Sequence, residues 1–74
     1  MFINDFNALT GIKRISRAEI ARRLGETPAN LGQKVNRDYL ADSTMKDICE
    51  VMNIKISVTY TDADTGEVVL KSDL

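Results

Sequence analysis

The sequence predicts a mainly α-helical single domain over residues 1–74 that ends in a β-hairpin. Apolar residues before residue 54 recur at the spacing of helices. From Ile54 to Tyr60, apolar and polar residues alternate, which is the period of a β-strand. We therefore expect a helical module at residues 1–53 and a hairpin at residues 54–71.

The composition is that of an ordinary globular protein, with 43% apolar and 28% charged residues. A domain of 74 residues buries only about 60% of its unfolded surface, so pairing with a second copy would add useful burial. No signal-peptide pattern or long apolar run is present, which favours a cytoplasmic protein that does not contact a membrane. Cys49 is the only cysteine and is expected to be a buried, reduced thiol.

The first and the last of the four expected helices lie on either side of residues 16–37. The first runs from Ile3 to about Thr10, and Gly11 is expected to end it, because glycine adopts the left-handed conformation found just past helix ends. The other starts after Asp42 or Ser43 and runs to about residue 52. The residues expected to face inward are Phe2, Phe6 and Leu9 in the first helix and Met45, Ile48, Cys49 and Met52 in the other.

Two short helices joined by a tight glycine turn are expected between residues 16 and 37. Ser16 and Glu19 have the spacing of a capping box, and Gly25 stops the helix that they open. Thr27 then acts as the N-cap of the next helix, with Pro28 at its first position. The inward residues of the pair are Ile20, Ala21, Leu24, Leu31 and Val35.

The C-terminal segment is expected to be a dimerisation element. Residues 62–66 are dense in turn formers, and residues 68–71 form the returning strand. An isolated hairpin is marginal in water, so it must pack on the helices, pair with another chain, or both. The residues expected to contact a second copy are Ile54, Ile56, Val58, Tyr60 and Val68.

The net charge of −1 conceals a strong asymmetry. Residues 12–37 hold seven basic and two acidic residues, a net +5, whereas residues 38–74 hold three basic and eight acidic residues, a net −5. Such a division suggests one surface that faces phosphate and another that faces away from it. The alternative interpretation is that the basic run is a solvated face.

The stretch Ser16-Arg-Ala-Glu-Ile-Ala-Arg-Arg-Leu-Gly-Glu-Thr-Pro-Ala-Asn-Leu-Gly-Gln-Lys-Val-Asn-Arg37 resembles the helix-turn-helix of the lambda-repressor and Cro type, the XRE family, especially its small phage or bacterial members. The resemblance covers most of the chain and implies a lambda-repressor-like domain of four or five helices. Two features depart from it: Glu26 replaces an apolar turn residue, which predicts a more exposed turn, and four helices precede the strand where many relatives have five.

The resemblance implies a sequence-specific transcriptional regulator of double-stranded DNA, a repressor acting as a homodimer. The second helix of such a motif enters the major groove, where Gln33 can bond adenine at two atoms and Ala29 can touch a thymine methyl. The residues expected to face bases are Pro28, Ala29, Asn30 and Gln33. Those expected to meet phosphates are Arg17, Thr27, Lys34, Asn36 and Arg37, of which Arg17 and Asn36 rest on the resemblance alone.

An enzyme is not expected, because the chain has no histidine and Cys49 therefore lacks the usual activating base. The acidic residues Asp62, Asp64 and Glu67 match no calcium loop, so no metal and no cofactor are expected. The alternative function is a protein-binding module of a mobile element, an antitoxin or an anti-defence inhibitor, that reuses the same fold. DNA, a second copy and another protein are thus the partners considered.

Overall fold

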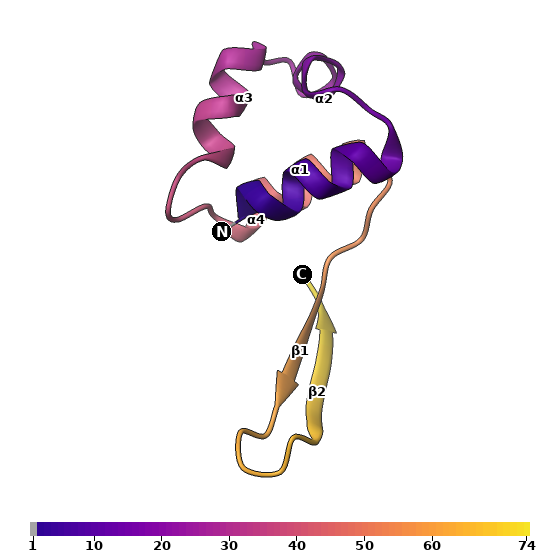
Figure 1. Cartoon of the computed structure of the whole chain (residues 1–74), viewed down its shortest axis with the longest axis vertical. Coiled ribbons are helices and arrows are strands. Elements are labelled where there is room, and N and C mark those ends of the chain that lie inside the picture. Colours follow the sequence, from indigo (N-terminus) through magenta and orange to yellow (C-terminus); the bar gives the residue numbers. More distant parts are fainter. Residues whose placement is uncertain (1) are drawn as a thin grey trace.

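The computed structural model describes residues 2–74 as four helices followed by a two-stranded antiparallel hairpin. The helices gather at one end of the molecule and the hairpin projects away from them (Figure 1), so that the chain measures 44 × 23 × 19 Å. The mainly α-helical class with a C-terminal hairpin is confirmed; residue 1 lies outside the described part. The elements are α1 Phe2–Lys13, α2 Arg17–Arg23, α3 Pro28–Val35, α4 Asp42–Val51, β1 Ser57–Thr61 and β2 Val68–Asp73.

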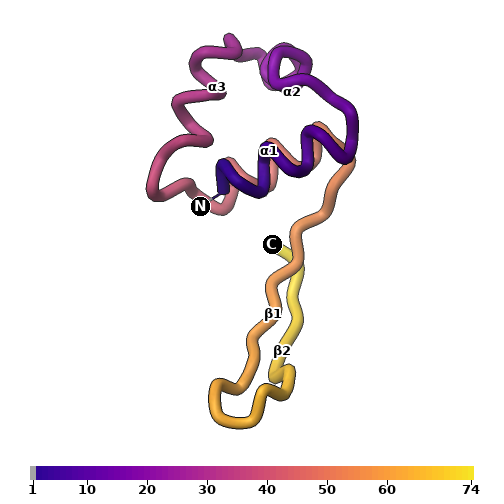
Figure 2. Tube along the Cα trace, viewed as in Figure 1, coloured from indigo at the N-terminus to yellow at the C-terminus, as the bar shows by residue number. Residues whose placement is uncertain are grey.

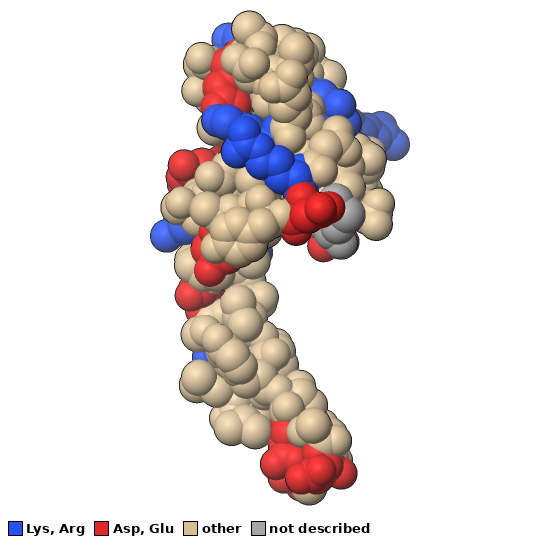
Figure 3. Space-filling view, turned by 90° about the vertical axis from the view of Figure 1, so that its left-hand side faces the viewer, with Lys and Arg blue, Asp and Glu red and all other residues tan. Residues whose placement is uncertain are grey.

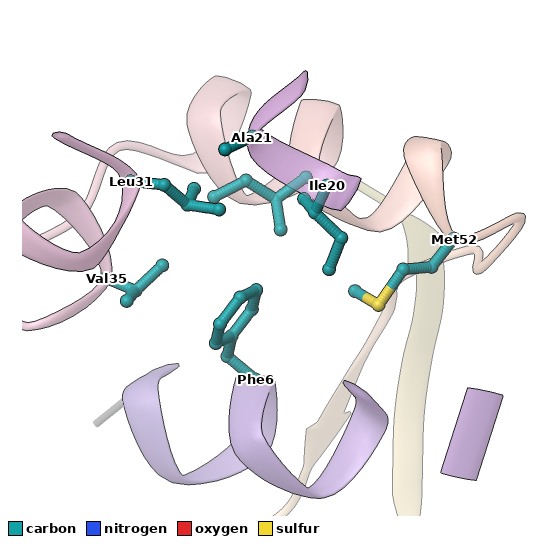
Figure 4. Close-up of a cluster of buried hydrophobic side chains, with 7 residues drawn as sticks. Phe6, Ile20, Ala21, Leu31, Val35 and Met52 are labelled. Carbon is teal, nitrogen blue, oxygen red and sulfur yellow. The ribbon is translucent and has the colours of Figure 1, made fainter. Parts of the chain in front are cut away.

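One apolar core joins the four helices. Phe6 of α1 is fully buried, and Figure 4 shows its ring reaching from α1 into the space between Val35 of α3 and Ile20 of α2. Every inward residue expected in α2 and α3 is buried or half-buried. The buried set is Phe6, Ile20, Ala21, Leu31, Val35, Ile48, Cys49 and Met52.

Helix α1 is longer than the sequence predicts. It continues through Gly11 to Lys13, so the expectation that Gly11 ends it is wrong. The left-handed residue is instead Arg14, whose φ is 52°, and the Ile15 amide donates to the Thr10 carbonyl at 3.2 Å. Gly11 tolerates the helical conformation as well as the left-handed one, so its identity alone does not place the end of the helix.

The two caps predicted for the middle helices are confirmed. The Ser16 hydroxyl accepts from the Glu19 amide at 3.1 Å, and the Thr27 hydroxyl accepts from the Asn30 amide at 3.2 Å. Gly25 has a φ of 72°, a conformation that favours glycine, and it reverses the chain between α2 and α3. Pro28 occupies the first turn of α3, where its missing amide hydrogen costs nothing.

The end of α4 directs the chain toward the hairpin. Asn53 is left-handed, with a φ of 57°, and the Ile54 amide donates to the Cys49 carbonyl at 2.9 Å. Ile54 then packs against the helical core, which is why the strand begins at Ser57 and not, as predicted, at Ile54. Figure 2 follows this connection from the helices into β1.

The hairpin register contains one irregularity. Tyr60 pairs with Leu70, but Thr61 pairs with Val68, so Val69 is an extra residue in β2. Gly66 in the connecting turn has a φ of 77°, as its position predicts. None of α1–α4, over the residues that the structure describes, has both the length and the apolar character needed to cross a bilayer.

Replacing Phe6 by alanine should lower the free energy of unfolding by about 3–5 kcal/mol, because it leaves a cavity where four helices meet. Urea unfolding followed by circular dichroism measures the loss. Tyr39→Ala is the control, since Tyr39 is 82% exposed and its removal should change stability by less than about 0.5 kcal/mol. Similar losses of unfolding free energy in both variants would contradict the role of Phe6 in the core.

Candidate nucleic-acid interface

Helix α3 presents one face to solvent and fixes the other in the core. Leu31, Gly32 and Val35 are buried, and this anchors the helix against α1 and α2. The exposed residues along its outer side are Thr27, Pro28, Ala29, Asn30 and Gln33. All four residues expected to face bases are therefore accessible to solvent, with Ala29, Asn30 and Gln33 on the side opposite the buried residues and Pro28 at the first position of the helix.

Asn36 and Arg37, which follow α3, differ in whether their side chains are engaged within the protein. The Asn36 side-chain amide donates to the Gly32 carbonyl at 2.9 Å, so Asn36 closes the C-terminus of its own helix. Arg37 is exposed and makes no ion pair among residues 2–74. Of the two, Arg37 is the better placed to meet a phosphate.

Lys34 is engaged within the protein. Its ammonium group pairs with the carboxylate of Glu26 in the turn between α2 and α3. The Glu26 side chain is 22% exposed, whereas Gly25 and Thr27 on either side of it are exposed, so the turn is open around a partly buried carboxylate. A phosphate at Lys34 would have to compete with Glu26, whose second oxygen, Oε2, is buried and makes no hydrogen bond.

Arg17 lies between α1 and α3. Its guanidinium carbon is 5.6 Å from the centre of the Phe6 ring, a cation–π arrangement, and Nη2 donates to the Asn7 side-chain oxygen at 3.4 Å. Its Nη1 is 3.3 Å from the position that a Cβ on Gly32 would occupy. Arg17 thus supports the inner side of α3, whereas the sequence predicts it as a phosphate contact.

Glu19 neutralises two neighbouring arginines on α2. Its carboxylate accepts from Nε of Arg22 and Nε of Arg23, both at 2.9 Å. These hydrogen bonds lower the pKa of Glu19 from 4.5 to about 2, and the same carboxylate raises the pKa of Arg22. The carboxylate therefore faces the arginines and does not complete the capping box by returning to Ser16.

The charge asymmetry of the sequence is also a separation in space. Acidic side chains cover the far end of the hairpin in Figure 3, whereas most of the basic surface in that view lies over the helical end. The acidic residues of this turn are Asp62, Asp64 and Glu67. The basic residues of the segment 12–37 that make no ion pair among residues 2–74 are Lys13, Arg14, Arg17 and Arg37.

Tyr39 is a candidate contact that sequence reasoning missed. It lies in the loop between α3 and α4, two residues after Arg37, and its side chain is 82% exposed. It belongs to no periodic pattern, so only its position after the basic segment could have indicated it. Its phenol can donate one hydrogen bond.

The described residues offer little for catalysis or metal binding. Burial raises the pKa of the Cys49 thiol, which disfavours the nucleophilic thiolate. Among residues 2–74, no cluster of three or more histidine, cysteine, aspartate or glutamate side chains could hold a metal ion. No family model, curated protein or solved structure matches the sequence or the fold.

Gly32→Ala tests the contact between Arg17 and α3. Alanine is favoured over glycine inside a helix by about 1 kcal/mol, but the new Cβ would press on the Arg17 guanidinium. We expect the substitution to add about 1 kcal/mol to the free energy of unfolding in an Arg17→Ala background and clearly less in the wild type. A double-mutant cycle in urea measures the difference, and equal gains in both backgrounds would refute the contact.

Acid should weaken the fold through Glu19. Its pKa is 4.5 as a free side chain and about 2 when folded, so its contribution is complete above pH 4.5 and is lost as the pH falls toward 2. Glu19→Gln should flatten the decline of the thermal midpoint over that window. Glu50→Gln is the matched control and should keep the wild-type decline, because it removes an exposed carboxylate that makes no ion pair with any of residues 2–74.

Proposed function

We propose that this chain is a sequence-specific DNA-binding regulator whose α2–turn–α3 unit is a helix-turn-helix of the lambda-repressor and Cro type. The observation that carries the proposal is the geometry of α3. Its inner face is buried, its outer face exposes small and amide side chains, and just past its C-cap stands Arg37, which has no ion-pair partner in the described part of the chain. A helix of this kind fits the major groove, with its N-terminal residues toward the bases.

Each exposed residue has a role in this proposal. Gln33 reads adenine through two hydrogen bonds, and Ala29 contacts a thymine methyl group. Pro28 and Asn30 lie beside them at the start of the helix. The Thr27 backbone amide and the Arg37 guanidinium hold the flanking phosphates. Lys34 and Asn36 join them only by exchanging their internal partners, Glu26 and the Gly32 carbonyl.

The regulator acts as a homodimer in this proposal. A recognition helix with a single strong reader, Gln33, gives weak binding alone, and a two-fold axis doubles its contacts. The hairpin supports the pairing, since it leaves apolar side chains in solvent. These are Tyr60, Val68, Val69 and Leu70, each 55–68% exposed. Occupied half-sites would lie about 34–36 Å apart and repression would follow from blocking a promoter.

Selection of bound sequences from a random duplex pool should return a palindromic site. The affinity for that site can be measured by fluorescence anisotropy. Its logarithm should fall steeply and linearly with the logarithm of the salt concentration. Absence of binding to any duplex at low salt would refute the proposal.

Two single substitutions separate the roles on α3. Gln33→Ala should reduce the preference for the selected site over random duplex, by about 1–3 kcal/mol, while leaving random binding unchanged. Arg37→Ala should weaken binding to all duplexes alike. It should also reduce the slope of log affinity against log salt by the contribution of about one phosphate contact. Asp64→Asn, at the far end of the hairpin, is the control for a general loss of function and should keep both properties.

A protein-binding module is the second candidate, and a specific observation favours it. Three of the seven basic residues in the segment 12–37 are held in internal ion pairs, and the hairpin ends in an acidic turn. That turn would suit a basic partner protein, as in an antitoxin or an anti-defence inhibitor. Under this alternative the DNA experiment fails and Asp64→Asn weakens capture of the partner.

A further inference from the structure

The two edges of the hairpin differ in how well they are protected. Edge strands normally avoid pairing with other chains through charges, proline or bulges. Strand β2 has such protection, with Lys71, Asp73 and the extra residue Val69. Strand β1 reads Ser-Val-Thr-Tyr-Thr, without a charge, a proline or an extra residue. Its outer edge is therefore open to another strand.

The backbone groups on that outer edge can be assigned. The Leu74 amide donates to the Ile56 carbonyl at 3.1 Å, and the Asp62 amide donates to the Glu67 carbonyl at 2.8 Å. The backbone amide and carbonyl groups of Ile56 and Asp62, which flank β1, therefore point toward β2. The direction of these backbone groups alternates from one residue to the next along a strand. The groups of residues 58 and 60 therefore also point toward β2, and those of residues 57, 59 and 61 point away from it.

The same register divides the hairpin into two faces. Val58 is opposite Ser72 and Tyr60 is opposite Leu70, so Val58, Tyr60 and Leu70 share one face. Thr59, opposite Lys71, lies on the other face. The sequence missed Leu70 as an interface residue, because the extra Val69 shifts the alternation of β2.

We propose that β1 is the strand through which two copies pair, antiparallel and centred on Thr59. The inference rests on the homodimer of the proposed function and names its contact. In this register Thr59 faces Thr59 of the second copy, Ser57 faces Thr61 and Val58 faces Tyr60. All five residues of β1 are paired, and every outward amide and carbonyl of positions 57, 59 and 61 finds a partner.

This pairing is complementary in both shape and polarity. It forms a four-stranded sheet in the order β2-β1-β1-β2. Val58 and Tyr60 of both copies lie together on one face, where aromatic and β-branched neighbours stabilise a sheet. Thr59 and its symmetry mate lie on the opposite face and can exchange a hydrogen bond. Three or more strands with an apolar face are stable where a lone hairpin is not.

Charge disfavours the parallel orientation. The centre at Thr59 places Ala63 of one copy opposite Lys55 of the other, so the acidic pair Asp62 and Asp64 approaches the base of the neighbouring hairpin. Lys55 is itself paired with Asp73 at 2.8 Å, and Glu50 lines the same hollow as Lys46, so this base carries balanced charge and does not repel the turn. A parallel arrangement would instead set the two acidic turns side by side, where like charges repel.

Pairing through β2 is disfavoured by its residues. Centred on Leu70, the pairing would run through the irregular Val69, and centred on Lys71 it would set two ammonium groups face to face. Lys71 is therefore the natural control position, because it points outward from β2 as Thr59 does from β1.

Thr59→Cys and Lys71→Cys test the assignment by disulfide trapping of the full chain. Directly opposite residues of such a pair have Cα atoms about 5.5 Å apart, within the range that a disulfide spans. Treatment with diamide, which takes up two electrons and two protons for each disulfide formed, should convert most of Thr59→Cys to a covalent dimer. Lys71→Cys should remain largely monomeric on a non-reducing gel, and the untreated variants should keep the wild-type circular dichroism.

Three outcomes would overturn the proposal: stronger trapping at Lys71, equal trapping at both positions, or none at Thr59. Sedimentation of the wild type shows which inference has failed. A wild-type dimer without trapping at Thr59 refutes the β1 contact alone. A wild-type monomer refutes the homodimer as well. Whether the protein binds DNA is decided separately, by the duplex-binding experiment.

Discussion

The position of the Phe6 ring is the constraint on which the other features depend. It lies where α1, α2, α3 and α4 meet, and Arg17 stacks over it while supporting the inner side of α3. Gly32 allows the guanidinium to approach closely because it has no side chain there. The orientation of the exposed α3 surface is thus set by one aromatic ring, one arginine and one missing methyl group.

Ion pairing within the chain decides how much of the basic charge reaches the surface. Glu19 takes up two arginines and Glu26 takes up Lys34, so the net +5 of the segment 12–37 overstates the charge available to a ligand. The other cations of this segment, which make no ion pair within the described residues, lie at the end of α1, near the start of α2 and after α3. For the proposed DNA ligand, this arrangement favours contacts with a few phosphates over strong non-specific attraction.

Local chemistry was predictable from the sequence, and long-range geometry was not. The caps at Ser16 and Thr27 and the left-handed Gly25 depend on neighbouring residues, and all three were expected. The run of α1 through Gly11 depends on packing that no single residue encodes. The internal roles of Arg17 and Lys34 arise from contacts across 15 and 8 positions, which residue type and helical face alone do not reveal.

The separation of the hairpin from the helical core has a consequence for how such a chain can diversify. The segment Ser57–Thr61 contributes nothing to the buried core, and α3 lies at the other end of the molecule. In the proposed dimer, changes along the strand would alter which chains associate without disturbing the surface of α3. Under that proposal, paralogous copies in one cell could acquire mutually exclusive pairing while they retain a common α3 surface.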